Sequence, residues 1–185
     1  MMMHALEAGG LPAVYDKEYD ERHKGYIKPD YHPNPDGYYE PSESKKRLFE
    51  SYPEQFDNHA IKLIGNYGWL RLPEWNGTYS VVLMVRDPNE IAASYKKFFG
   101  HEPVWEDPVS GESIPFSADF YNRLIFSLAA QLENRKDVVS FIMLNGKNVI
   151  ENPLAAFYYL KDNGWPIEPW WAASQVKPAL YRNRK

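Results

Sequence analysis

Two short and almost uninterrupted apolar runs dominate the hydrophobic pattern of the chain. They cover residues 79–85 and 138–144, where apolar side chains occupy consecutive positions instead of alternating ones. A strand with apolar side chains on both faces is typical of a parallel sheet that is covered on each side. Shorter apolar runs at residues 11–15 and 60–64 are interpreted as two further strands.

Between these runs, apolar residues recur at the spacing of a helix. The clearest helix is predicted to begin at Asp87, because Asp87, Pro88 and Glu90 form a typical capping sequence. An apolar stripe then follows this helix through Ile91, Tyr95, Phe98 and Phe99. Further helices are predicted at residues 1–8, 42–56, 117–134 and 152–164. Residues 16–40, 165–171 and 175–185 lack a clear period and are interpreted as irregular or extended.

The alternation of helices with short apolar strands predicts an α/β protein. We expect three layers, with one open and mostly parallel sheet between helices on both faces. The chain has 185 residues and contains no internal repeat or long linker, so a single domain over residues 1–185 is expected.

Composition narrows the classes of function. The formal net charge is −4, which disfavours a nucleic-acid binder because such proteins usually carry a basic surplus. The chain has no cysteines, so disulfides and thiolate metal sites are excluded. The five histidines lack the spacing of helix ligands, and no metal is expected. No apolar run approaches the ~20 residues of a membrane span, and no signal peptide is recognised. We therefore expect a cytoplasmic protein that does not bind membranes.

The most informative stretch is residues 81–95, Val-Val-Leu-Met-Val-Arg-Asp-Pro-Asn-Glu-Ile-Ala-Ala-Ser-Tyr. A buried strand, an Arg-Asp-Pro turn and a helix with Ser eight residues after the Arg resemble the 3′-phosphate-binding motif of sulfotransferases. These P-loop-fold enzymes use PAPS as donor, and their Arg and Ser hold its 3′-phosphate. The resemblance implies that Arg86 and Ser94 bind PAPS or its product, adenosine 3′,5′-bisphosphate (PAP). The alternative is that Arg86 and Asp87 only join the strand to the helix cap.

Other segments resemble bacterial and phage sulfotransferase-like proteins. They are residues 6–12 at the end of the first helix, residues 34–40, residues 60–63 in the second strand and residues 176–182 near the C-terminus. The resemblance therefore extends over nearly the whole chain, although only the Arg and Ser motif is individually specific.

One part of the family pattern is missing. Sulfotransferases carry a loop of the type Gly-x-Pro-Arg-Ser-Gly-Thr-Ser before the first helix, where backbone amides hold the 5′-phosphosulfate. Here residues 1–3 already belong to the predicted first helix, and no Gly-rich phosphate loop follows. We therefore expect a P-loop-like domain that is N-terminally truncated. Two explanations stay open: the natural start lies upstream, or the chain is a degenerate relative kept for binding or structure.

For an active enzyme, the resemblance implies transfer of a sulfuryl group from PAPS to a hydroxyl or amine, if the missing loop is supplied. The acceptor is then a small molecule or a glycan. Glu40 is our candidate base, because it follows a Gly-Tyr-Tyr segment and glycosaminoglycan sulfotransferases use a Glu in an aromatic context. Lys62 is our candidate cation near the sulfuryl group. Arg182, in the basic tail, is a candidate ligand of the donor phosphate. Both residues also have a non-catalytic interpretation. Glu40 is then only a carboxylate that precedes a helix, and Lys62 is only an exposed lysine at the end of a strand.

A second class of function also fits the sequence. Without the loop, the chain can be interpreted as a non-catalytic protein of the same fold, with a role in protein interaction or in a structural assembly. If the protein is viral, this interpretation places it in the virion. A protein partner or a second copy then covers an edge of the sheet. Only the enzyme class requires Arg86 and Ser94 to meet at a phosphate-sized site.

Overall fold

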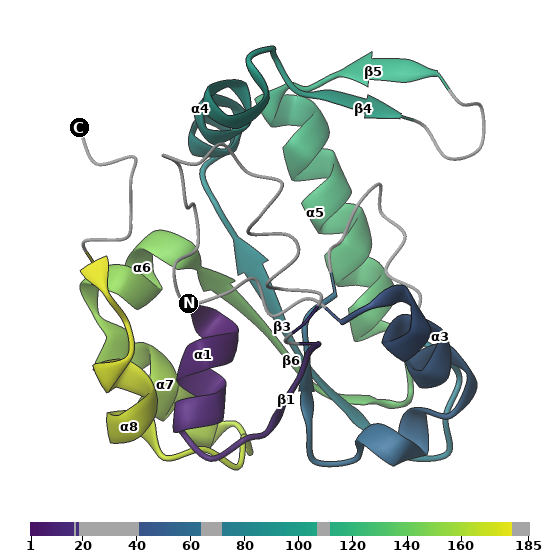
Figure 1. Cartoon of the computed structure of the whole chain (residues 1–185), viewed down its shortest axis with the longest axis vertical. Helices are drawn as coiled ribbons and strands as arrows, with labels where there is room; N and C mark the ends of the chain where they lie inside the picture. Colours follow the sequence, from purple (N-terminus) through teal and green to yellow (C-terminus); the bar gives the residue numbers. More distant parts are fainter. Residues whose placement is uncertain (17, 19–40, 64–71, 107–111, 179–185) are drawn as a thin grey trace.

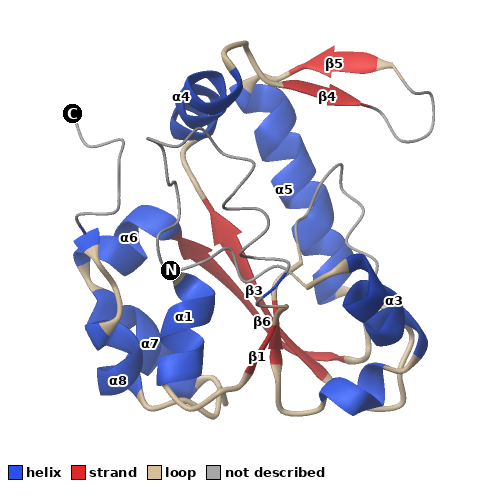
Figure 2. Cartoon of the chain, viewed as in Figure 1, coloured by secondary structure: helices blue, strands red, loops and turns tan. Residues whose placement is uncertain are grey.

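The computed structural model describes residues 1–16, 18, 41–63, 72–106 and 112–178 (Figure 1). The predicted base Glu40 and the predicted phosphate ligand Arg182 lie outside these residues, so their roles stay predictions. Figure 2 shows helices interspersed with short strands, which confirms the α/β class. No helix in the described ranges combines the length and the apolar character needed to cross a membrane.

The centre of the fold is a pair of parallel strands, β3 (Tyr79–Val85) and β6 (Val138–Asn145). Both strands and their parallel pairing agree with the prediction. Parallel neighbours need a crossover connection, and here it contains α4 (Pro88–Phe99) and α5 (Ala118–Glu133). The boundaries predicted for these two helices are correct to within about two residues.

A β-bulge at Val139 explains which side chains of β6 share a face. The partner of Tyr79 is Val138 and that of the next residue is Ser140, so Val139 is the extra residue and its side chain is exposed. The bulge shifts the alternation of side chains by one position. As a result, Val138 and Phe141 pack against the same cluster although they are not an even number of positions apart.

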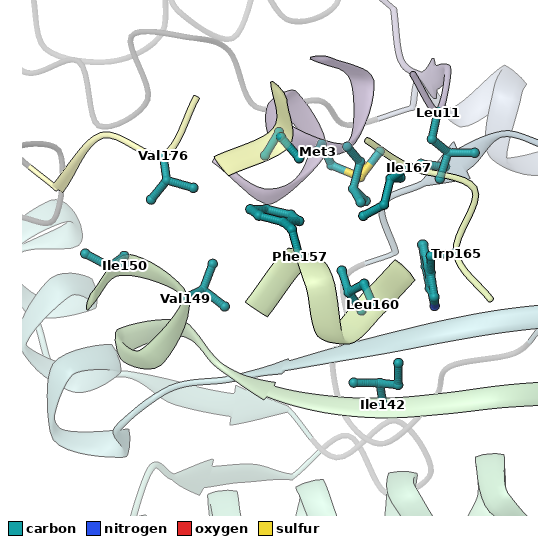
Figure 3. Close-up of a cluster of buried hydrophobic side chains, with 14 residues drawn as sticks. Met3, Leu11, Ile142, Val149, Ile150, Phe157, Leu160, Trp165, Ile167 and Val176 are labelled. Atoms are coloured by element: carbon teal, nitrogen blue, oxygen red, sulfur yellow. The ribbon is translucent and has the colours of Figure 1, made fainter. Parts of the chain in front are cut away.

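One face of the strand pair packs against the larger core cluster, shown in Figure 3. Ile142 contributes from β6, and Phe157 and Leu160 are fully buried within the cluster. Phe157 and Leu160 belong to α7 (Pro153–Asp162), and further buried side chains come from α1 (Met2–Ala8), α6 (Gly146–Glu151) and α8 (Pro169–Ser174), as well as from segments between the helices.

The opposite face of the strand pair packs against a smaller cluster. Leu128 and Leu132 of α5 are buried there, together with Phe49 of α3 (Glu43–Ser51). Helices thus cover both faces of β3 and β6. The apolar run predicted a fully buried β3, whereas its side chains are mostly only partly buried. A strand pair this narrow leaves its side chains less covered than a wide sheet does.

A second parallel pair, β1 (Ala13–Val14) with β2 (Ala60–Ile61), is only two residues long. Ala60 belongs to the larger cluster and Ile61 packs against the smaller one, so β2 also lies between the two clusters. Within the described residues, each hydrogen-bonded sheet contains two strands, instead of one wide sheet. The coarser expectation of short parallel strands among helices is confirmed.

The structure also contains elements that the hydrophobic pattern does not predict. An antiparallel hairpin, β4 (Val104–Glu106) with β5 (Ser113–Pro115), extends away from the body beside α4 and α5 (Figure 1). The short helices α6 and α8 were likewise not expected. In the stretch predicted as helical, residues 42–56, Pro53 was expected to limit the helix, and α3 does end before it, because Pro53 cannot continue α3. The 3₁₀-helix that follows (Pro53–Phe56) was not predicted.

The amino-terminal end of the strand pair is tied together by Arg135. Its guanidinium donates to both carboxylate oxygens of Asp137 and to the backbone carbonyls of Leu72 and Pro73. It also lies over the ring of Tyr79, 5.6 Å from the ring centroid. The hydrogen bonds from Arg135 lower the pKa of Asp137 below its ordinary value. We call these residues the Arg135 clip.

Candidate anion-binding site

The carboxyl ends of β3 and β6 lie side by side, since Val85 pairs with Asn145. Each strand leads almost directly into a helix there, β3 into α4 and β6 into α6. The side chain of Asp87 caps α4 by accepting a hydrogen bond from the N–H of Asn89 at 2.8 Å, as predicted. Asn145 caps α6 by accepting from the N–H of Lys147 at 2.9 Å. This edge is the position at which open α/β sheets bind ligands.

Arg86 lies at this edge, immediately after β3. Its backbone N–H donates a hydrogen bond to the hydroxyl of Tyr121 (3.2 Å), and its side chain is 42% exposed. Nη2 of the guanidinium is 3.9 Å from Oε2 of Glu90, which allows an ion pair but is too long for a hydrogen bond. Among the described residues, no acceptor forms a hydrogen bond with the guanidinium. Within that part of the chain, its five N–H donors are therefore unused.

Ser94 lies on the same face of α4 as Glu90, because the two residues are about one turn apart. The ion pair with Glu90 directs the guanidinium of Arg86 toward this face. The side chain of Ser94 is partly buried, and its hydroxyl forms no hydrogen bond with a described residue. The structure therefore brings Arg86 and Ser94 to one side of α4.

Tyr121 is a residue of this edge that sequence reasoning misses. Its side chain is 7% exposed, and the ring of Phe116 packs on it with centroids 6.1 Å apart. Its hydroxyl accepts the hydrogen bond from Arg86 and donates none to a described residue, which leaves one further donor at this edge. No motif marks Tyr121, because its contact with Arg86 depends on how the crossover folds back toward β6.

Gly146 brings the start of α6 close to Arg86. A Cβ added at Gly146 would lie 3.6 Å from Cγ of Arg86 and 3.6 Å from the carbonyl oxygen of Val85. These are ordinary van der Waals distances, so the backbone of α6 borders the Arg86 side chain. The ends of both strands thus take part in the site.

The other predicted site residues lie elsewhere or outside the described chain. Lys62 follows β2, and its neighbours Ile61 and Leu63 pack against the smaller cluster. The Lys62 side chain is partly buried, whereas an ordinary strand-end lysine was expected to be exposed. Its catalytic role stays a prediction, as do the roles of Glu40 and Arg182. Within the described ranges, no three His, Asp or Glu side chains are grouped so as to hold a metal ion.

These features define a mixed α/β protein built on parallel strand pairs, with an arginine at the carboxyl end of its central strand. No protein-family model matches the sequence, and comparisons with curated proteins and with solved structures return no match. A functional assignment therefore depends on the residues of the site and on the sequence motif that contains them.

Proposed function

We propose that the chain is a sulfotransferase-like protein that binds the 3′-phosphate of PAPS or of PAP at the carboxyl end of β3. The observation that carries this proposal is the position of Arg86 and Ser94 on one side of α4. Both side chains have hydrogen-bond donors that no described residue uses. The motif at residues 81–95 supports the same pair of residues from the sequence.

The chemistry of these groups suits a phosphate monoester. A guanidinium donates two parallel hydrogen bonds to phosphate oxygens, and a serine hydroxyl adds another. The start of α4 contributes the positive end of the helix dipole, which favours an anion, although the N–H of Asn89 already donates to the cap Asp87. The O–H of Tyr121 is a further donor, from α5. Arg86, Ser94 and Tyr121 thus offer the kinds of donor that a phosphate needs, close to the positive end of α4.

The proposal includes the finer fold, a three-layer P-loop-like domain with a mostly parallel sheet. Support comes from the helices on both faces of β3 and β6. Further support comes from β2, which contributes Ala60 to one cluster and packs Ile61 against the other. Parallel strands between two layers of helices are the arrangement of doubly wound α/β proteins.

In a form that has a phosphate loop, the proposed reaction transfers a sulfuryl group from PAPS to a hydroxyl or amine of a small-molecule or glycan acceptor. A base takes the acceptor proton while the acceptor oxygen or nitrogen bonds to sulfur. The bond between sulfur and the bridging phosphate oxygen breaks, and PAP leaves with its electron pair. In this reaction Glu40 acts as the base, Lys62 stabilises the departing phosphate, and Arg182 is a further ligand of the donor.

A non-catalytic interaction protein is the second candidate function, and it is favoured by aromatic side chains on α7 and α8. Tyr158 and Tyr159 are 41% and 52% exposed, and Trp170 and Trp171 are 63% and 66% exposed. Aromatic side chains are enriched in protein interfaces, where they combine large area with a polar group. Under this alternative, a protein partner or a second copy of the chain is the main ligand.

Calorimetric titration with PAP tests the nucleotide site. We expect the unsubstituted chain to bind, and Arg86→Ala to bind at least about tenfold more weakly, because hydrogen bonds to charged groups contribute about 1.5–3 kcal/mol. Ser94→Ala should weaken binding by a smaller factor, since it removes one uncharged donor. The affinity for adenosine 5′-phosphate should change little in either variant, because this nucleotide lacks the 3′-phosphate.

Arg123→Ala is the matched control for these titrations. Arg123 also forms an ion pair within its helix, with Asp119, but it is 74% exposed on α5. The control should bind PAP as the unsubstituted chain does. If the folded, unsubstituted chain does not bind PAP, or if Arg86→Ala binds it equally well, the proposal is wrong and the interaction protein becomes the better candidate.

A further inference from the structure

The guanidinium of Arg86 faces a carboxylate of its own chain. Glu90 lies in the first turn of α4 with its side chain 22% exposed, and its Oε2 is 3.9 Å from Nη2 of Arg86. At this distance the carboxylate attracts the guanidinium without forming a hydrogen bond. Arg86 is thus held toward α4 by charge alone, while its N–H donors are unused within the described residues.

The helix itself gains little from this pair. Asp87, the N-cap, already accepts from the N–H of Asn89. An acid in the first turn interacts favourably with the helix dipole wherever its carboxylate points, so the contact with Arg86 is not required for that effect. An ion pair in which the base precedes the acid by one turn is also the weaker of the two orientations. The contact therefore bears mainly on Arg86.

We infer that Glu90 is an internal competitor for the anion that Arg86 binds, and that it limits the affinity of the site for phosphate monoesters. This inference rests on the proposed function. A phosphate monoester carries about −1.5 to −2 charges and three acceptor oxygens, so it displaces a carboxylate that makes no hydrogen bond to the guanidinium. Once bound, the phosphate and the Glu90 carboxylate share one face of α4 and repel each other. Both effects weaken binding, and both are absent when residue 90 is neutral.

An opposing effect is smaller. Glu90 also restrains the guanidinium before a ligand arrives, and its loss gives Arg86 more freedom. A partly exposed ion pair within one helix restrains its partners only weakly. The repulsion between a carboxylate and a doubly charged phosphate in a partly buried site is stronger. Neutralising Glu90 therefore strengthens binding on balance.

The test is calorimetric titration of the full chain and of Glu90→Gln with PAP and with adenosine 5′-phosphate. We expect Glu90→Gln to bind PAP about tenfold more tightly than the unsubstituted chain. The change for adenosine 5′-phosphate should be much smaller. Glu90→Ala should shift the affinity in the same direction, which separates the loss of charge from the gain of an amide. Glu43→Gln is the matched control, since Glu43 is also a first-turn glutamate, paired with Lys46 on α3.

The outcomes distinguish this inference from the proposed function. Tighter binding of PAP by Glu90→Gln, with Glu43→Gln unchanged, supports the competitor role even if the unsubstituted chain binds too weakly to measure. Binding by the unsubstituted chain that Glu90→Gln leaves equal or weakens overturns the competitor role alone. Absence of binding by both proteins overturns the proposed function and this inference together. Circular dichroism and thermal unfolding of each variant show whether the titrated protein is folded.

Discussion

The hydroxyl of Tyr121 accepts a hydrogen bond of 3.2 Å from the backbone N–H of Arg86. This bond joins α5 to the end of β3. Phe116, just after the β4–β5 hairpin, packs its ring against the same tyrosine. The position of Arg86 therefore depends on the residues that return the chain to β6. A substitution in α5 is expected to shift the backbone of Arg86 even when it makes no contact with the guanidinium.

Tyr121→Phe should destabilise the protein by about 1 kcal/mol, because the partly buried N–H of Arg86 loses its acceptor. The variant should also bind PAP more weakly, since the backbone that carries Arg86 is less firmly held and the proposed O–H donor to the phosphate is lost. Urea unfolding measures the first effect and calorimetry the second. Tyr159→Phe is the control, since Tyr159 is 52% exposed and its change should stay within about 0.5 kcal/mol. Equal stability of the two variants would show that the Arg86 N–H gains nothing from Tyr121.

Removal of the Arg135 clip should lower the free energy of unfolding by more than Tyr121→Phe does. Arg135→Ala removes the hydrogen bonds to the carbonyl of Leu72 and to the carboxylate of Asp137. The carbonyl of Pro73 loses one of its two donors and keeps the hydroxyl of Tyr79. We expect a loss of about 2 kcal/mol in the free energy of unfolding, measured with urea. Arg123→Ala, which breaks an exposed ion pair, should cost less than about 1 kcal/mol. If Arg135→Ala lowers the free energy of unfolding no more than Arg123→Ala does, water replaces the hydrogen bonds of the clip without a loss of stability.

Asp137 makes the clip sensitive to acid. The hydrogen bonds from Arg135 lower the pKa of Asp137 below its ordinary value of 3.8. A carboxylate whose pKa is lower in the folded state stabilises the protein fully above its unfolded-state pKa. This stabilisation is lost as the pH falls through the folded-state pKa. Urea unfolding between about pH 7 and pH 2 should show a steeper loss of stability in the unsubstituted chain than in Asp137→Asn. If the stability of the two proteins depends on pH in the same way, Asp137 is not the source of the acid sensitivity.

Neighbouring residues of α7 should respond very differently to truncation. Phe157 is fully buried in the larger cluster, whereas Tyr158 is 41% exposed. Phe157→Ala leaves a cavity and should cost about 3–5 kcal/mol in the free energy of unfolding. Tyr158→Ala should cost less than about 1 kcal/mol. Thermal or urea unfolding of the two variants checks this, and similar losses would contradict the orientation of α7.

The elements that the sequence predicts well are those with a strong local signal. β3 is an unbroken apolar run, and α4 begins at Asp87 with a capping sequence that the structure uses. The hydrophobic pattern does not predict α8. Pro169 suits the first turn of a helix, but the large apolar side chains of Trp170 and Trp171 are exposed instead of facing the core. Its apolar residues therefore do not form one stripe. The strands β4 and β5 are three residues each, too short to show a period.

At the candidate site, the motif predicts Arg86 and Ser94 but not the residues around them. Glu90 was expected only as part of a cap, and the structure also brings its carboxylate near the guanidinium of Arg86. The spacing of Arg86 and Glu90 contains this information, because the two residues are four positions apart, about one helical turn. Tyr121 has no such signal, since its contact with Arg86 is made between elements that only the folded crossover brings together.

The pairing of β3 with β6 also bears on the rate at which the protein folds. The paired residues are about 60 positions apart in the chain, so a long loop must close before this pair forms. Such distant pairing slows folding compared with helix formation. Arg86, Ser94 and Tyr121 all lie in the segment that closes. After dilution from denaturant, helical signal should therefore return before the ability to bind an anion, and the delay between the two reports on closure of the crossover.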